Sequence, residues 1–245
     1  MATIVCLRQG SEPSPSGDGS EPLFLKKFSY WSLPIRLTGT GQKNDWRLMM
    51  SNSPRNCKPG LTYHTKSRCI ELKALMRHDS MKDMVLDVIK ITQNKYNFRF
   101  MGYKVMDNHF HFLIQTVENG ETISRIMQYI KARIAERYNR AAGRTGPFWN
   151  ERYSDIIVEE QKNPAQYLFW LLWYMAFNAV KAGMCCDPRD YKYSSINCYL
   201  KEGFTSTVKI IRHQYFEELG ATFAERAKKF LYYEEAYRKR YALMF

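Results

Sequence analysis

The stretch from Asn163 to Gly183 has the features of a helix that must be covered on most of its surface. Asn163 is a favourable N-cap, Pro164 suits the first helical position, and Gly183 follows the last turn. The residues between them are apolar almost all the way round, as in a helix packed inside a protein. The stretch approaches the length of a membrane span, but the polar Gln166 and Asn178 and the capped start favour a core helix.

Two polar side chains share one face of this helix. Tyr174 and Asn178 are four residues apart, so the hydroxyl and the carboxamide lie one turn from each other. The amide oxygen could be a metal ligand, and the phenol could be a nucleophile. The alternative is structural, because a buried tyrosine usually bonds a backbone group and Asn178 could cap the helix end. The helix pattern alone favours that structural alternative.

The run from Tyr103 to Ile114 contains two histidines separated by one residue. β-Branched and aromatic residues surround them and an Asn-Gly turn follows, so the run is predicted to be a strand. His109 and His111 then project from the same face. Neutral imidazoles are common metal ligands, and two of them leave positions open for a third ligand and a substrate. Taken alone, this spacing is more often found on the wet face of a strand.

The predicted elements from Leu61 onward follow the order strand, helix, strand, strand, helix, strand, helix. The strands are expected at 62–69, 98–106, 109–117 and 153–159, and the helices at 77–93, 122–140 and 163–183. This order predicts an α+β fold, a ferredoxin-like four-stranded antiparallel sheet with packed helices. The fold alone says little about function, because many activities share it.

The two ends of the 245-residue chain differ from its centre. Residues 1–50 include a run rich in Ser, Pro and Gly, so we expect a flexible N-terminal extension. The central domain is expected to span 51–200. Met49 and Met50 stand directly before it, and we hypothesise that translation begins there in vivo. Residues 201–245 are expected to form a helical C-terminal tail, especially over 216–241, without an assigned role.

Positive charge is concentrated on one predicted helix. The net charge of +13 is typical of a phosphate-binding protein, although it does not distinguish DNA from RNA or from an anionic surface. Between residues 122 and 150 Glu136 is the single acid, and an isoleucine-rich stripe leaves most basic residues on the solvent side. The alternative is a charged helix face that is exposed to solvent and binds no ligand. The strong excess of basic over acidic residues makes this alternative less favoured. The candidate nucleic-acid contacts are Lys66, Arg68, Arg125, Lys131, Arg133, Arg137, Arg140, Arg144 and Arg152.

Four segments together resemble a known family. They are His109-Phe110-His111, residues 143–153, residues 174–183, and Asp187-Pro188 with residues 191–195. In this order and spacing, between about Leu61 and Leu200, they resemble the REP-associated tyrosine transposases. That family belongs to the single-tyrosine HUH transposases of bacterial insertion sequences.

The resemblance implies an activity and a set of site residues. It implies a metal-dependent endonuclease and strand transferase that acts on single-stranded DNA with imperfect hairpins, from repeats or element ends. Tyr174 would attack the scissile phosphate, giving a 5′-phosphotyrosine and a free 3′-hydroxyl. His109, His111 and Asn178 would hold the metal. Two histidines and an amide make a weak site that suits exchangeable Mg²⁺ or Mn²⁺, and the histidines favour Mn²⁺ in vitro.

Two positions depart from the family pattern. The usual Asn-Pro-Val reads Asn178-Ala179-Val180, and Asp107 stands where proline is common. Neither change removes a group that does chemistry. Asp107 could orient a metal-bound histidine, although a turn residue is the simpler interpretation.

Other features restrict partners and location. Six cysteines without a Cys-x-x-Cys pair and the lack of a signal peptide predict a reduced cytoplasmic protein, nucleoid-associated when bound to DNA. No glycine-rich phosphate loop stands out, so ATP is not expected, and neither is a membrane partner. Monomer and homodimer both remain open.

Two alternatives to a transposase are considered. A domesticated relative would bind hairpin DNA or RNA without cutting it, although the set His109, His111, Tyr174 and Asn178 is intact. A metal-dependent phosphodiesterase would use water instead of tyrosine. Product analysis separates the last case, because only tyrosine attack leaves DNA covalently bound to protein.

Overall fold

The computed structural model describes residues 57–241. The expectations for the N-terminal extension, residues 1–50, and for a start at Met49-Met50 lie outside the described residues.

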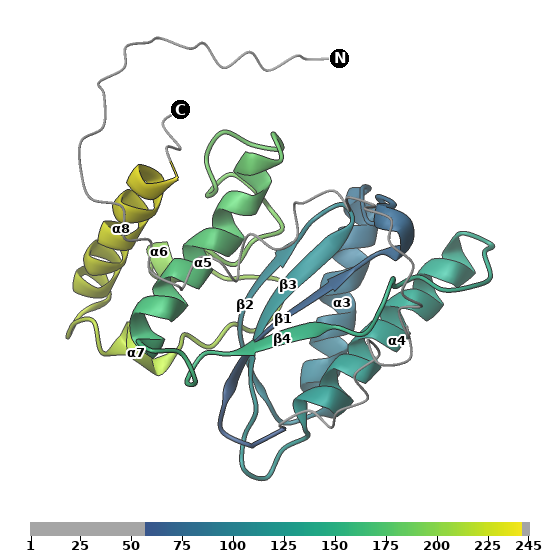
Figure 1. Ribbon diagram of the computed structural model, residues 1–245, viewed down its shortest axis with the longest axis horizontal. Helices are drawn as coiled ribbons and strands as arrows, with labels where there is room; N and C mark the ends of the chain where they lie inside the picture. Colours follow the sequence, from purple (N-terminus) through teal and green to yellow (C-terminus); the bar gives the residue numbers. More distant parts are fainter. Residues whose placement is uncertain (1–56, 242–245) are drawn as a thin grey trace, which may run out of the picture. The chain divides into compact units, whose positions relative to one another are not determined.

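Four strands form one antiparallel sheet (Figure 1). They are β1 (Thr62–Arg68), β2 (Arg99–Val105), β3 (His109–Gln115) and β4 (Ser154–Ile157), in the spatial order β2-β3-β1-β4. Helix α3 (Asp79–Lys95) connects β1 to β2, and α4 (Ile123–Ala141) connects β3 to β4. This is the split βαβ arrangement of ferredoxin-like folds, so the predicted fold is confirmed. The observed strands end one or two residues inside most of the predicted limits.

One face of the sheet packs against α3 and α4. Strand side chains such as Tyr63, Phe110 and Phe112 are buried there with the apolar sides of the two helices. The predicted buried stripe of α4 is confirmed, since all five of its members are fully buried: Ile123, Ile126, Met127, Ile130 and Ile134. Helix α3 begins and ends two residues later than predicted, because His78 takes the N-cap position and the helix continues to Lys95.

Helix α5 (Pro164–Lys181) lies on the opposite face of the sheet (Figure 1). The predicted ends are confirmed, because the Asn163 side chain accepts a hydrogen bond from the backbone N–H of Gln166 and Gly183 has a positive φ of 68°. The helix approaches β2 closely at Gly102, where an added Cβ would lie 3.5 Å from Leu172 and 3.2 Å from Ser195 Oγ. No helix in the described part of the chain has both the length and the apolar character that a bilayer span requires.

The C-terminal residues cover the side of α5 that faces away from the sheet (Figure 1). They form α6 (Asn197–Leu200), α7 (Gln214–Glu217) and α8 (Phe223–Arg240). The indole of Trp173 stacks on Phe230 of α8, with ring centroids 5.0 Å apart, and donates a hydrogen bond to its carbonyl oxygen. Helix α5 is therefore buried on both sides, as its composition requires.

The prediction of one helical stretch over 216–241 is wrong at its start. The chain breaks between α7 and α8, where Thr222 caps α8 by accepting a hydrogen bond from the Glu225 N–H. Gly220 lies at this break, and a Cβ there would come within 2.7 Å of the Glu225 Cβ. The close contact leaves no room for a side chain at position 220 in the turn between the two helices.

Candidate active site on the α5 face of the sheet

Two histidines and two basic residues meet on the face of the sheet that α5 covers. Strand pairing places Lys66 of β1 opposite His111 of β3, and Arg68 opposite His109. The rings of His109 and His111 are 5.2 Å apart, which confirms that they share a face. Lys66 and Arg68 are half-buried beside them, so the predicted strand-borne cations lie at the histidine pair.

Each histidine of the pair has its Nδ1 engaged by a neighbour. His109 Nδ1 is 2.7 Å from Asn108 Oδ1, and His111 Nδ1 is 2.9 Å from His64 Nε2. The His64 and His111 rings also stack, with centroids 5.1 Å apart. Because Nδ1 of each ring is already engaged, Nε2 is the nitrogen that is available to a metal ion in both histidines.

His64 is a site residue that the sequence reasoning missed. It is buried on β1, two residues before Lys66, and therefore projects from the same face. The same alternation that drew attention to Lys66 and Arg68 could have identified it. Only the fold shows that its partner is His111, because the two lie on different strands.

All three histidines are held in the neutral form. Burial, together with the smaller effect of nearby Lys66, lowers the pKa of His64 to about 3 and that of His109 to about 4. Burial also holds the pKa of His111 well below its usual value. A neutral imidazole is the form that binds a metal ion, so no proton has to be displaced at pH 7.

Helix α5 places Tyr174 against this pair. The ring of Tyr174 lies 5.5 Å from that of His111 and nearly perpendicular to it. A side-chain hydrogen bond joins Tyr174 to Asn178, one turn farther along the helix. Burial raises the pKa of the Tyr174 phenol, while the bond with Asn178 opposes that shift. The phenol is therefore protonated at neutral pH and must lose its proton to become a nucleophile.

One buried atom of the proposed ligand set, His111 Nε2, has no hydrogen-bond partner among residues 57–241. Such atoms are rare in folded proteins because desolvation is costly. With the imidazole of His109 and the carboxamide oxygen of Asn178, it would form a donor set of two nitrogens and one oxygen, which is chemically suited to a divalent cation. Within residues 57–241 no group of three His, Cys, Asp or Glu side chains could hold a metal ion.

Lys104 is a second residue that the sequence reasoning missed. Its side chain is fully buried on β2 opposite His111, and Nζ donates a hydrogen bond to the Ala176 carbonyl oxygen at 3.1 Å. The ammonium also lies 4.0 Å from the centre of the Tyr191 ring. Burial lowers the pKa of Lys104 to about 7. Lys104 thus ties the sheet to the turn of α5 that separates Tyr174 from Asn178.

Three other tyrosines lie near the predicted motifs, and the fold separates them from Tyr174. Tyr153 bonds Ser124 of α4 at 3.1 Å, and Tyr138 packs against Phe148, so both are on the opposite face of the sheet. Tyr167 is on α5, two turns before Tyr174, and is almost fully buried. The ring of Tyr174, by contrast, contacts His111.

The remaining predicted basic residues lie on or near α4, on the other side of the sheet. Arg133 and Arg140 both form ion pairs with Glu136, at 2.7 and 3.0 Å. Lys131 and Arg144 donate to backbone carbonyls, while Arg125 and Arg152 are exposed and Arg137 is half-exposed. The structure therefore separates the α4 cations from Tyr174, because α4 and α5 cover opposite faces.

Asp107 is a turn residue, in agreement with the simpler interpretation. Its carboxylate forms ion pairs with Lys82, at 2.8 Å, and with Arg77, at 3.8 Å. Its carbonyl oxygen accepts from the Met76 N–H. The residue that orients His109 is the neighbouring Asn108.

Residues 57–167 match the family described as "Transposase IS200 like". The match contains His109 and His111 and ends before Tyr174. A solved structure of a REP-associated tyrosine transposase bound to a REP hairpin has the same fold, with a TM-score of 0.52, 18% identity, and coverage of 66% of this chain and 92% of that chain. A crystal structure from Deinococcus radiodurans R1 with a provisional transposase assignment has a TM-score of 0.34 and 22% identity over 49% of this chain and 94% of that chain. No curated protein matches this chain.

Proposed function

We propose that this chain, whose residues 57–167 match the IS200-like transposase family, is a transposase that cuts and rejoins single-stranded, hairpin-forming DNA with Tyr174 as the nucleophile. His109, His111 and Asn178 would hold Mg²⁺ or Mn²⁺. The observation that carries the proposal is the contact of the Tyr174 ring with His111 on a shared, largely buried face.

Cleavage of a phosphodiester by a tyrosine requires the cation and the phenol at the same site. When bound, a divalent cation screens the charge of the phosphodiester and stabilises the transition state. Tyr174 Oη forms a bond to phosphorus, and the bond from phosphorus to the 3′ oxygen breaks. The phenol loses its proton, and the 3′ oxygen gains one. A tyrosine ester conserves the bond energy of the cut strand, which suits rejoining rather than digestion.

The DNA partner is inferred from the charges at the site. Lys66 and Arg68 lie directly beside the histidine pair on the neighbouring strand, where they can contact the phosphates of a strand crossing the sheet. The solved structure with the same fold contains a hairpin, and we propose a hairpin of repeat or element-end DNA for this chain as well.

Tyr174→Phe tests the proposal through one oxygen atom. The substitution keeps the ring and its contact with His111 and removes one hydrogen bond, to Asn178, so stability should fall by about 1 kcal/mol. DNA cleavage should vanish. Wild-type protein with a single-stranded hairpin oligonucleotide and Mn²⁺ should form an adduct that survives denaturation, and peptide mapping should place the 5′-phosphate on Tyr174.

Tyr167→Phe is the matched control, because this second phenol of α5 is buried two turns away. It should leave adduct formation intact. An adduct on Tyr167, or full cleavage by Tyr174→Phe, would show that the nucleophile is misassigned. Cleavage without any adduct would favour attack by water, and tight binding without cleavage would favour the domesticated binding protein.

A further inference from the structure

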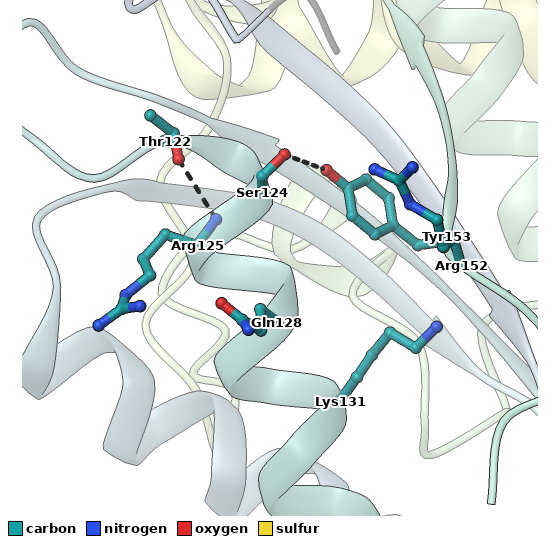
Figure 2. A pocket seen from close by; sticks show the side chains of 7 residues that line it. All are labelled: Thr122, Ser124, Arg125, Gln128, Lys131, Arg152 and Tyr153. Atoms are coloured by element: carbon teal, nitrogen blue, oxygen red, sulfur yellow. Dashed lines mark hydrogen bonds between the residues drawn. The ribbon is translucent and has the colours of Figure 1, made fainter. Parts of the chain in front are cut away.

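A cavity of about 570 Å³ opens beside the first half of α4 (Figure 2). Its volume lies within the range of about 300–1,000 Å³ that is typical of small-ligand pockets. Arg125, Gln128 and Lys131 follow one another at intervals of three along α4, so they line the same side of the helix. Arg152 and Tyr153, which directly precede β4, form the opposite wall.

Among the residues that the structure describes, three cations and no carboxylate line the cavity. Elsewhere on α4, Arg133 and Arg140 are neutralised by Glu136. Among residues 57–241, neither Arg125 nor Arg152 has a carboxylate partner, and both are exposed. Lys131 Nζ donates to the Glu151 carbonyl oxygen at 2.6 Å, which holds it at the rim. The cavity is therefore suited to a ligand with more than one negative charge.

Groups that can contact a base lie between these cations. In Figure 2, Gln128 lies between Arg125 on one side and Arg152 with Lys131 on the other. The exposed carboxamide of Gln128 offers both a donor and an acceptor, which is the combination that pairs with base edges. In a nucleic-acid strand, one base is likewise flanked by a phosphate on each side.

The cavity lies at the β4 edge of the sheet, on the α4 face and therefore on the face opposite the proposed cleavage site. Strand β4 is one of the two edge strands, and its Ser154 pairs with Lys66, which in turn pairs with His111. Two strand spacings, about 10 Å, thus separate His111 from the start of β4. A DNA strand that passes over Lys66 and then around the β4 edge would reach Arg152 within a few nucleotides.

We propose that this cavity binds one unpaired nucleotide of the DNA substrate, a few positions from the cleaved phosphate. Arg125 and Arg152 would contact its flanking phosphates, and Gln128 would contact its base. The inference rests on the proposed function, because it takes single-stranded DNA as the substrate.

The test measures binding in EDTA, so that cleavage does not interfere. The probes are hairpin oligodeoxynucleotides from the repeats beside the gene, with single-stranded flanks that carry one abasic site at successive positions. For wild-type protein, one flank position should cost about tenfold in affinity when its base is removed. Gln128→Ala should bind the intact probe with an affinity that is lower by a similar factor. On the probe that lacks this base, Gln128→Ala and the wild-type protein should bind with equal affinity.

Charge-removing variants test the phosphate contacts. Arg125→Ala and Arg152→Ala should each lower the slope of log affinity against log salt concentration by about 0.7. Lys90→Ala, which removes an exposed cation from α3, is the matched control and should change neither the slope nor the abasic pattern. All these side chains are exposed, so folding should be unaffected.

The inference would be overturned if Gln128→Ala and an abasic site lowered the DNA affinity additively at every flank position. It would also be overturned if neither Arg125→Ala nor Arg152→Ala changed the slope of log affinity against log salt concentration. The nucleophile assignment is tested separately. Tyr174→Phe should bind with the wild-type abasic pattern, and Gln128→Ala should still form the covalent adduct at saturating DNA. If the covalent adduct forms but the losses from Gln128→Ala and from the abasic site are additive, only the proposed nucleotide binding in the cavity is refuted. If those losses are not additive but no adduct forms, only the proposed cleavage chemistry is refuted.

Discussion

The contact between His64 and His111 allows the strongest quantitative prediction about the metal. His64 is buried, and its Nε2 lies 2.9 Å from His111 Nδ1, so it sets which nitrogen of His111 is left for a ligand. Loss of a partner that orients a metal-binding histidine typically weakens metal affinity by about 10-fold to 100-fold. His64→Phe keeps a ring that can stack on His111 and removes the hydrogen bond. We therefore expect it to weaken Mn²⁺ binding by that factor.

The assay is thermal or chemical unfolding of the protein without DNA, with and without Mn²⁺. At a hundredfold excess of Mn²⁺ over Kd, binding should stabilise the wild-type protein by about 2.7 kcal/mol. For a variant with tenfold weaker affinity the same concentration should contribute about 1.4 kcal/mol, and with hundredfold weaker affinity about 0.4 kcal/mol. The metal-dependent difference separates this effect from any direct loss of stability.

His64→Gln is the matched variant, because its amide can hydrogen-bond His111 but cannot stack. It should keep most of the Mn²⁺ stabilisation. Undiminished stabilisation of His64→Phe would refute the orienting role. Equal loss in both variants would also refute it, since the hydrogen bond would then not be the property that matters.

Two further predictions concern the metal pair and the basic helix. His109→Ala or His111→Ala should abolish cleavage in Mg²⁺ and Mn²⁺ while leaving hairpin binding largely intact, because most phosphate contacts lie elsewhere; wild-type cleavage rates in excess EDTA would contradict a metal role. Arg137→Ala, on the solvent side of α4, should weaken DNA binding regardless of sequence and lower the salt slope by about 0.7, and an unchanged slope would show that this part of the helix is only solvated.

Features that depend on neighbouring residues could be predicted from the sequence. The cap at Asn163, the first-turn Pro164 and the terminal Gly183 define α5 through local backbone geometry. The shared face of His109 and His111 follows from the period of a strand, and the Tyr174–Asn178 pair from the period of a helix. The order of strands and helices was sufficient for the fold class, because few topologies accommodate it.

Features that depend on packing between distant segments required the tertiary structure. Strand pairing brings His64 to His111 across 47 residues, and no local pattern encodes that partner. The sequence showed that α4 carries a basic face, but only its packing against the α3 side of the sheet separates that face from Tyr174. The break at Gly220 depends on its contact with Glu225, and the cavity beside α4 exists because the segment before β4 returns to the helix. Local periodicity determines which face a side chain occupies, whereas the partner that it meets there depends on how the faces pack.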